Sequence, residues 1–392
     1  MYFTRRRFKR TASLLGLLVV ISSMFFLSLT VRQLDESLKY SRVPYDAESH
    51  HLFAIVTWDH RVPPTQPTTQ HCTNRNSTLT NGPGSPTKNI TTESKPTHVP
   101  LYSDEVINPH SFNFTISNSD ACLRNMSNGT EIFLLILVKC RPGANFERDL
   151  IRKTWGGVSQ VDGRRVLTMF LVGLTGKSAI NAMVAEENKQ HHDLIQANFM
   201  DSYRNLSYKT SMGFRWTIEF CQGASYVASS DSDMLVNVHN IVKRLVNKPR
   251  QKYAEGNLRI AEEPGRNPKL KWFTSKELYP EPTYAPFFTG AFYVLTTDVA
   301  SNACREFVHV RFIPWEDAYI GLVLKTVGGV HLENAAGYAE DVNLLRKDDA
   351  PIVSALVKSQ VVLLDHQSNG VNPKYLKIWE EAMSQLKKDI QM

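Results

Sequence analysis

Four apolar runs separated by segments of helix length are the feature that most constrains the fold of this chain. The runs cover residues 131–140, 164–173, 193–200 and 226–230, and helices are predicted at residues 146–155, 178–191 and 206–221. Continuous apolar runs of this length are typical of strands buried on both faces. Their alternation with helices predicts an α/β fold, with a mainly parallel sheet flanked by helices on both sides. The second half is more mixed, with a strand at 287–295 and helices at 315–325 and 375–389.

Two aspartates, Asp231 and Asp233, follow the fourth apolar run, and we predict an apolar helix directly after them. Ligands of open α/β sheets bind beyond the carboxyl ends of the strands, and paired carboxylates suit a hard divalent cation. A cation bound there could in turn hold a diphosphate. The alternative is a solvated turn in which the acids cap the following helix.

The formal net charge of +7 is concentrated at the N-terminus. Five cations lie at Arg5, Arg6, Arg7, Lys9 and Arg10, so the rest of the chain is close to neutral. Because nucleic-acid binding needs basic residues gathered on one face of the folded domain, we expect no nucleic-acid partner.

Residues 11–31 form an uncharged run rich in Leu, Val, Ile and Phe. Its length suits one membrane-spanning helix, whereas a cleaved signal peptide would have a shorter apolar core and a small-residue cleavage site. The preceding cations keep residues 1–10 in the cytoplasm. We therefore expect a single-pass type II signal anchor, with everything after Arg32 in the lumen or outside the cell.

Residues 32–130 read as a lumenal stem, because Pro, Ser, Thr and Asn dominate from 63 to 98 and few apolar residues can be buried. Glycosylation sequons, which fit a lumenal glycoprotein, occur at Asn76, Asn89, Asn113, Asn125, Asn128 and Asn205. The globular domain is predicted to span residues 131–392.

The five cysteines are Cys72, Cys122, Cys140, Cys221 and Cys304. An oxidising lumen permits disulfides, but an odd number cannot all pair within one chain, and no spacing indicates a zinc site. Cys72, in the stem, is the predicted odd residue and could join two chains. A non-covalent oligomer is the alternative.

Several segments, in order, resemble the β-1,3-galactosyltransferase family. They are RDLIRKTWG (148–156), DSYRNLSYKT (201–210), DSD (231–233), KWF (271–273), YP (279–280), YAPFFTGAFYVL (284–295) and WEDAYIG (315–321). Each segment alone is weakly specific, and the ordered set is strongly specific. The family also contains β-1,3-N-acetylglucosaminyltransferases, so the resemblance indicates the reaction more firmly than the donor sugar.

The resemblance implies a GT-A type nucleotide-sugar-binding fold and a Golgi enzyme of protein glycosylation, with an anchor, a stem and a lumenal catalytic domain. It also implies transfer of a hexose, most simply galactose, from a UDP-sugar with inversion and a divalent metal, Mn²⁺. A base must take the proton of the acceptor hydroxyl, and a Lewis acid must stabilise the departing diphosphate.

The resemblance assigns the base to Asp317, which its neighbour Glu316 could assist or replace. The alternative for this acid pair is an ordinary first helical turn, where carboxylates favour the helix dipole. Asp233 is expected to bind the metal, and Asp231 to lie near the ribose or the metal's water ligands. His366 resembles the late histidine that completes the family's manganese site, and His331 is the fallback.

The first helix of the globular part supplies further candidates for nucleotide binding. Arg148 or Arg152 could bind the diphosphate, because a guanidinium suits paired oxygens, and Trp155 could pack near the nucleotide. The alternative is a helix surface with a core aromatic. The aromatics Phe287, Phe288, Phe292 and Tyr293 are expected to form either a sugar platform or a core strand.

The chain departs from the family pattern at three positions. Ser232 replaces the middle of three usual acids, Ser229 replaces a frequent lysine, and Phe292 replaces a small residue. Asp231 and Asp233 remain. These changes leave two hypotheses: an active transferase, or a catalytically silent relative that binds glycans or assists a partner. A secreted lectin is a weaker third. The charged segment around 250–269 is predicted to be a surface loop.

Overall fold

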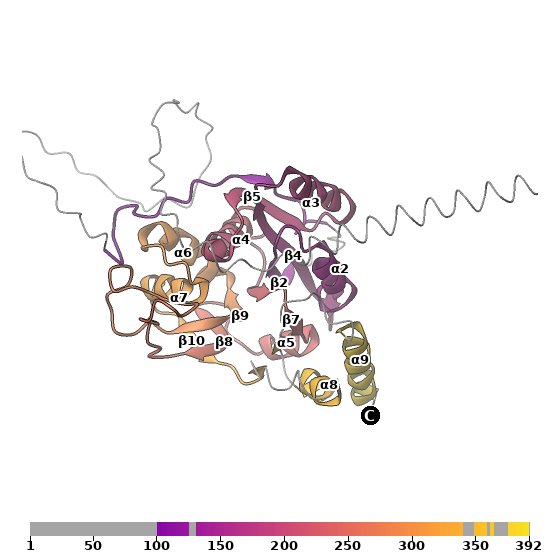
Figure 1. The fold of residues 1–392 in the computed structure, drawn as a ribbon. Helices are drawn as coiled ribbons and strands as arrows, with labels where there is room; N and C mark the ends of the chain where they lie inside the picture. Colours follow the sequence, from indigo (N-terminus) through magenta and orange to yellow (C-terminus); the bar gives the residue numbers. More distant parts are fainter. Residues whose placement is uncertain (1–99, 125–130, 340–348, 359–360, 364–374, 392) are drawn as a thin grey trace, which may run out of the picture. The chain divides into compact units, whose positions relative to one another are not determined.

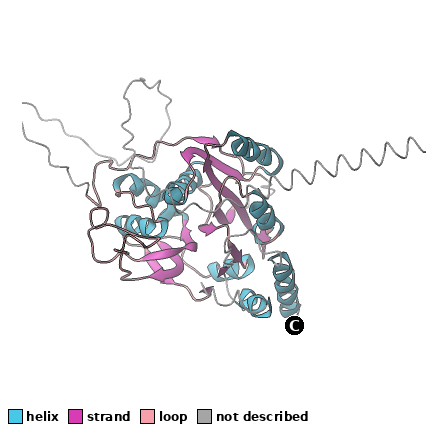
Figure 2. Cartoon of the chain, viewed as in Figure 1, coloured by secondary structure: helices cyan, strands magenta, loops and turns pink. Residues whose placement is uncertain are grey.

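The computed structural model describes residues 100–124, 131–339, 349–358, 361–363 and 375–391. Its centre is a mixed β-sheet with the strand order β1-β5-β4-β2-β6-β9-β8-β10, and helices lie on both sides (Figures 1 and 2). Among these residues no helix is both long enough and apolar enough to cross a membrane. The predicted anchor at 11–31 lies outside them.

The first half of the sheet is parallel, as predicted. Its strands are β2 (Ile132–Lys139), β4 (Arg164–Leu174), β5 (Leu194–Met200) and β6 (Tyr226–Asp231), and they alternate with α2 (Asn145–Lys153), α3 (Ser178–His191) and α4 (Leu206–Phe220). Every residue of β2 is buried, because helices cover both faces of this central strand. Two short elements, η1 (Trp155–Gly157) and β3 (Gln160–Val161), lead into β4, and η2 (Tyr203–Asn205) leads into α4.

The second half of the sheet corrects the prediction of a mainly parallel sheet. β9 (Phe287–Thr296) runs antiparallel to β6 and to β8 (Tyr253–Arg259), and only β10 (His331–Asn334) is parallel to its neighbour β8. An apolar run specifies a buried strand but not its direction, which depends on the connection before it. Here β9 follows β8 without a crossover helix, so the two strands pair in opposite directions.

Strand β8 also corrects the first part of the surface loop expected around residues 250–269, whereas residues 260–269 do lie in a loop. Residues 253–256 are buried, although they include Glu255. Its carboxylate accepts hydrogen bonds from the hydroxyls of Tyr253 and Tyr338, and it forms an ion pair of 2.9 Å with Arg244. A buried charge satisfied in this way is compatible with a strand interior.

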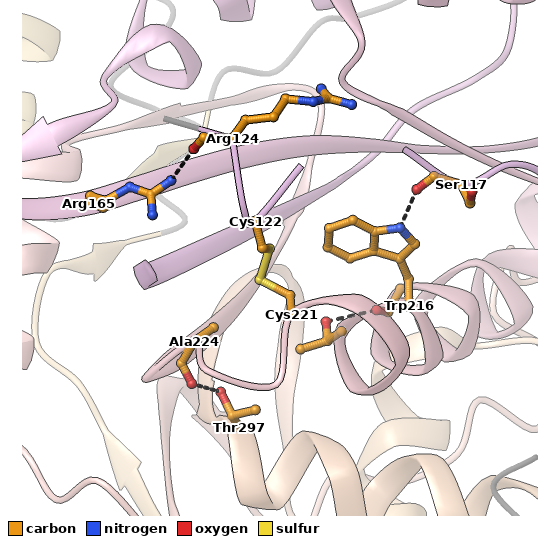
Figure 3. The surroundings of a disulfide bond; sticks show 10 residues. Ser117, Cys122, Arg124, Arg165, Trp216, Cys221, Ala224 and Thr297 are labelled. Carbon is orange, nitrogen blue, oxygen red and sulfur yellow. Dashed lines mark hydrogen bonds between the residues drawn. A yellow bond between two sulfur atoms is a disulfide. The ribbon is translucent and has the colours of Figure 1, made fainter. Parts of the chain in front are cut away.

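Residues 100–124 belong to the fold, although their composition placed them in the stem. β1 (Phe114–Ile116) adds an antiparallel edge strand to β5, and Phe112 is buried in the core. A disulfide joins Cys122 to Cys221, and the indole of Trp216 donates to the carbonyl of Ser117 beside it (Figure 3). Few contacts made by this segment are with sequence neighbours, so local composition did not reveal them.

A second, three-stranded sheet lies next to the acid pair. It contains β7 (Met234–Val236), β11 (Tyr338–Ala339) and β12 (Val361–Leu363), and α5 (Val238–Leu245) begins only after β7. The prediction of a helix directly after Asp233 was therefore wrong by one short strand. Because β12 pairs with β7, the C-terminal part of the chain fixes the segment that follows the acids.

Three helices cover one face of the main sheet: α4, α6 (Thr297–Glu306) and α7 (Glu316–Val327), with η3 (Phe307–His309) after α6. In Figure 1, α2 and α3 lie on the opposite side. The remaining helices, α8 (Asp349–Lys358) and α9 (Tyr375–Gln391), pack against each other. This arrangement brings the first turn of α7 to the end of β6.

Candidate active site

The site forms where the parallel strands β2 and β6 end side by side. Lys139, the last residue of β2, is in register with Asp231, the last residue of β6. The Lys139 side chain is buried, and its Nζ lies 3.3 Å from Oδ1 of Asp231. Because parallel strands present their carboxyl ends at one edge, this pairing places a buried cation beneath the acid pair.

Lys139 also connects the acid pair to α7. Its Nζ lies 3.2 Å from Oε2 of Glu316 and donates a hydrogen bond of 2.9 Å to the carbonyl of Gly290 in β9. A buried ammonium between two carboxylates is stabilised, whereas each partner alone would be costly to bury. One lysine thus joins the ends of β2 and β6 to Gly290 within β9 and to the first residue of α7.

Glu316 lies in the interior rather than facing a substrate. Its Oε1 accepts hydrogen bonds from the hydroxyls of Thr210 at 2.6 Å and Tyr293 at 2.9 Å. Its Oε2 accepts a hydrogen bond from the ammonium of Lys139. With both oxygens engaged by protein donors, Glu316 fixes the start of α7. The geometry corresponds to a positioning role and leaves no free oxygen for the predicted assistance in catalysis.

Asp317, the next residue, is partly exposed. Its Oδ1 accepts a 2.8 Å hydrogen bond from the backbone nitrogen of Ala318. Burial raises the pKa of Asp317 to about 6, and the neighbouring charge of Glu316 adds to the rise. A carboxylate with such a pKa is ionised at neutral pH and still basic enough to accept a proton. The first turn of α7 therefore combines both predicted alternatives, a helix start and a candidate base.

Asp231 reaches the surface although Lys139 does not. The Asp231 side chain is 37% exposed against 1% for its partner lysine. Desolvation raises the pKa of Asp231, the ammonium of Lys139 opposes the rise, and the charge of Asp233 adds to it. Two carboxylates that repel each other at the mouth of a site form a donor set that a divalent cation would relieve, so the residues fit a metal.

A complete ligand set is not contained in the described part of the chain. No cluster of three or more His, Cys, Asp or Glu with metal-binding geometry occurs there. His366, the predicted third ligand, lies outside the described residues. The fallback His331 is an exposed residue of β10 and stacks on Tyr253 at 5.9 Å between ring centroids.

The two predicted arginines bind α3 instead of the acid pair. Arg148 has no exposed surface, and its Nε donates to Glu187 at 2.8 Å. Arg152 forms ion pairs of 2.7 Å with Glu187 and 2.8 Å with Asp193. The guanidinium of Arg148 cannot touch a nucleotide without leaving the interior, so this structure assigns it the alternative role of joining α2 to α3.

Trp155 lies beneath the turn at residues 231–233, on its buried side, and holds the residue that follows it. It is fully buried, and its Nε1 donates to the carbonyl of Met234 at 3.0 Å and to the hydroxyl of Tyr375 at 2.7 Å. Met234 directly follows Asp233. On the other side of the turn, the hydroxyl of Ser232 donates to Glu147 of α2 at 3.2 Å. The buried indole thus positions the turn and does not offer a face to a nucleotide.

The aromatic run of β9 belongs to the core. Its side chains are nearly or fully buried, at 7% exposure or less: Phe287, Phe288, Phe292 and Tyr293. Of the departures from the family pattern, Ser229 and Phe292 are therefore interior residues, whereas Ser232 is partly exposed in the turn. Of the two alternatives for these aromatics, the structure therefore supports the core strand, and they offer no surface on which a sugar could stack.

Sequence reasoning missed Lys139, Thr210 and Gly290. Lys139 could have been found, because it ends a fully apolar strand and a buried lysine needs a carboxylate partner. The neighbouring strand ends in such a carboxylate, Asp231. Gly290 gave no signal: a Cβ there would lie 3.0 Å from Oε2 of Glu316. Such a close approach depends on how β9 and α7 pack.

Comparisons with known proteins identify the family of this chain. The Galactosyltransferase family profile matches residues 146–335. β-1,3-Galactosyltransferase 1 of Homo sapiens is 37% identical over 235 residues, which cover 59% of this chain and 70% of that protein. β-1,3-Galactosyltransferase 5 of Pan paniscus is 40% identical over 197 residues, covering 50% of this chain and 65% of that protein. The solved structure of galactosyltransferase LgtC with donor and acceptor sugar analogues covers 64% of this chain and 95% of its own, with 13% identity and a TM-score of 0.34.

The family profile and the two named relatives define a glycosyltransferase, which takes a sugar from a donor and passes it to a glycan acceptor. The chain belongs to the β-1,3-galactosyltransferase family, and it is a hexosyltransferase.

Proposed function

We propose that this protein transfers galactose from UDP-galactose to a hydroxyl of a glycoprotein or glycolipid glycan, forming a β-1,3 linkage with inversion. One observation carries the proposal: Lys139 joins Asp231 of the acid pair to Glu316, the residue before Asp317. A donor-binding acid pair and a proton-accepting carboxylate are thereby held at one site, as a single displacement requires.

Asp317 acts as the base in this proposal. The acceptor oxygen forms a bond to the anomeric carbon while the bond from that carbon to the diphosphate oxygen breaks. The hydroxyl proton passes to Asp317, and the bonding electrons leave with UDP. The raised pKa of Asp317, about 6, suits this role at neutral pH. Glu316 and Lys139 hold the first turn of α7 in place while the proton moves.

Asp231 and Asp233 would hold the divalent metal, Mn²⁺ in this proposal. When bound, such an ion neutralises negative charge on the leaving diphosphate. Asp231 remains partly exposed beside Asp233, whereas Lys139 balances charge from the buried side. His366 is the proposed further ligand, because imidazole suits manganese together with oxygen ligands.

The donor sugar rests on the similarity to proteins named β-1,3-galactosyltransferase, which favours UDP-galactose. Transfer of N-acetylglucosamine is the alternative within the reaction class. A catalytically silent relative is less well supported, because Asp231, Asp233 and Asp317 are all present, and Lys139 pairs both with Asp231 and with Glu316, the neighbour of Asp317.

We further propose a GT-A type fold and a single-pass type II location in the Golgi membrane. The alternating strands and helices that end at an acid pair support the fold. The apolar run at 11–31 and the cations before it support the anchor. The disulfide of Cys122 with Cys221 fits an oxidising lumen. The catalytic domain would then be lumenal, and Cys72 would be available for a link between two chains.

The test is release of UDP by the purified full-length protein with UDP-galactose, UDP-N-acetylglucosamine or UDP-N-acetylgalactosamine, over a panel of sugar acceptors, with Mn²⁺ or EDTA. We expect manganese-dependent transfer of galactose that disappears in Asp233→Ala and Asp317→Asn. Transfer of another sugar would replace the donor assignment. Absence of turnover with every donor, despite measurable UDP binding, would establish the silent relative.

A further inference from the structure

Trp272 is a large aromatic side chain left exposed in the loop between β8 and β9. It is 59% exposed, whereas the aromatics of β9 are buried. Its Nε1 donates a 3.1 Å hydrogen bond to the hydroxyl of Tyr203 in η2. An indole anchored through its nitrogen keeps a fixed orientation while its apolar face stays open to solvent.

Contacts between neighbouring aromatic residues connect Trp272 to the candidate base. The rings of Tyr203 and Trp315 have centroids 6.5 Å apart, and Trp315 immediately precedes Glu316 and Asp317. The Nε1 of Trp315 donates at 2.7 Å to Thr274, two residues after Trp272. The loop is therefore hydrogen-bonded directly to the residue before α7 through Trp315, and to η2 through Trp272, whose partner Tyr203 packs against Trp315.

The contact of Tyr203 with Trp315 shows which side of the site this loop borders, because Trp315 lies two residues before Asp317. Burial raises the pKa of the Tyr203 hydroxyl, and the largest charge effect comes from Asp317, ahead of Asp231. The loop thus borders the side of the site where the proton would be accepted. A donor held at Asp231 and Asp233 leaves this side to the sugar that supplies the hydroxyl.

Two cations lie over the rings of this aromatic cluster, and one of them, Lys271, lies over the exposed indole itself. Lys271 Nζ lies 5.3 Å from the Trp272 ring and 4.8 Å from the Tyr203 ring, and the Arg204 guanidinium lies 5.5 Å from the Trp315 ring. Lys271 and Arg204 are both exposed, so their N–H groups can reach hydroxyl oxygens of a bound molecule. An apolar face bordered by donors matches a sugar ring, which has an apolar C–H face and a polar edge.

We propose that Trp272 is the surface on which a sugar ring of the acceptor stacks, with Tyr203 orienting the indole. The inference rests on the proposed transferase function and adds the residue that selects the acceptor. It places the sugar platform on the loop before β9 instead of on β9 itself. The occupant is a neutral pyranose of the acceptor glycan.

The first test measures steady-state transfer by the full-length protein to methyl β-galactoside and methyl β-N-acetylglucosaminide. Trp272→Ala should raise the acceptor KM about ten-fold, the loss expected for a well-packed aromatic contact. The donor KM and the slow hydrolysis of donor without acceptor should stay unchanged. Trp272→Phe should keep most of the affinity, because the apolar face remains. Ile260→Ala, which removes another exposed apolar side chain from this loop, should behave as wild type.

Tyr203→Phe separates stacking from positioning, because it removes the hydroxyl that accepts from the Trp272 indole and retains the indole itself. It should therefore raise the acceptor KM by less than Trp272→Ala does. If Tyr203→Phe reproduces the whole effect of Trp272→Ala, the indole only positions its neighbour and the proposal is overturned. It is equally overturned if the acceptor KM of Trp272→Ala equals that of wild type, as a protein-docking role for the indole would give.

Saturation-transfer NMR with the same two glycosides decides the question without turnover. If the wild type transfers no sugar, the proposed function fails, but binding of the glycosides can still be observed. Signals from the sugar C–H protons that vanish in Trp272→Ala and persist in Ile260→Ala support the stacking surface. Equal signals in wild type and Trp272→Ala, or no binding to the wild type, contradict it.

Discussion

Gly290 of β9 lies against Glu316 of α7 so closely that a Cβ on the glycine would be 3.0 Å from Oε2 of the carboxylate. The same Cβ would lie 3.9 Å from Nζ of Lys139, to which the Gly290 carbonyl already accepts a hydrogen bond. Strand and helix can therefore meet at this carboxylate only because position 290 has no side chain.

Replacing Gly290 with alanine should displace Glu316 and lower the transfer rate about ten-fold or more, since small displacements of catalytic groups are costly. Overpacking should also destabilise the fold by about 1 to 3 kcal/mol. Enzyme kinetics and thermal unfolding would measure both. Gly176→Ala is the matched control, because a Cβ there meets nothing within 4 Å. Equal rates for the two variants would contradict the close-approach argument.

Lys139→Met should abolish transfer and destabilise the protein by about 3 to 5 kcal/mol, because it leaves Glu316 buried without its cation. Adding Glu316→Gln should recover part of the stability and none of the activity. Denaturant unfolding of the two single variants and the double variant gives the coupling energy. Lys153→Met, which removes an exposed lysine paired with Asp149 on α2, should change stability by less than about 0.5 kcal/mol. No coupling between Lys139 and Glu316 would refute the proposed link.

The pH dependence of kcat should follow Asp317. The folded-state pKa of about 6 means that the base is lost as the pH falls through 6, so kcat should drop about ten-fold for each pH unit below that value. A pH–rate profile at saturating substrates measures this limb. If Asp317→Glu retains activity, the pH at which its kcat begins to fall should differ from that of wild type. Asp149→Asn should keep the wild-type pH–rate profile. A rate that stays constant down to pH 5 would exclude Asp317 as the base.

The same carboxylate should reduce stability at neutral pH. Its pKa is raised on folding, so the folded state binds the proton more tightly and the ionised form opposes folding above the unfolded-state value near 4. Asp317→Asn should therefore raise the Tm at pH 7.5 by a few degrees, and the difference from wild type should shrink as the pH falls below 6. A lower Tm for Asp317→Asn at pH 7.5 would show that the carboxylate stabilises the fold.

Replacing Cys122 and Cys221 with serine should cost about 2 to 5 kcal/mol of stability, because the disulfide connects residues 99 positions apart and restricts the unfolded chain. Thermal unfolding with and without a reducing agent tests this. Reduction should lower the Tm of wild type and leave that of the double variant unchanged. A wild-type Tm insensitive to reduction would argue against a stabilising cross-link.

Prediction from sequence succeeded where a single segment carries its own signal. The apolar runs that became β2, β4, β5, β6 and β9 were found within one residue at each end, as were helices α3 and α4, and α7 was found within two. It failed at β8, where Glu255 made a buried strand resemble a loop until Arg244 and two tyrosines supplied its partners. Burial of a charge depends on residues distant in sequence, which no local pattern contains.

The site residues, too, include some that the sequence could predict and some that it could not. Asp231, Asp233 and Asp317 could be chosen from motifs that resemble a family, and their environment at one sheet edge agrees with the roles proposed. The arginines on α2 were chosen by residue type alone. Their carboxylate partners, Glu187 and Asp193, lie on and just after α3, so the ion pairs emerge only when the two helices are placed side by side.

The last described helix of the chain reaches back to the acid-bearing turn. The hydroxyl of Tyr375 donates to the carbonyl of Met234 at 2.6 Å, where the Trp155 indole also donates. A ribosome has therefore to synthesise the chain at least as far as Tyr375 before this turn acquires its final support. A nascent chain released before Tyr375 would contain every proposed catalytic carboxylate and still lack the contact that holds two of them in place, so early termination would act as a loss of function even without removing a reactive group.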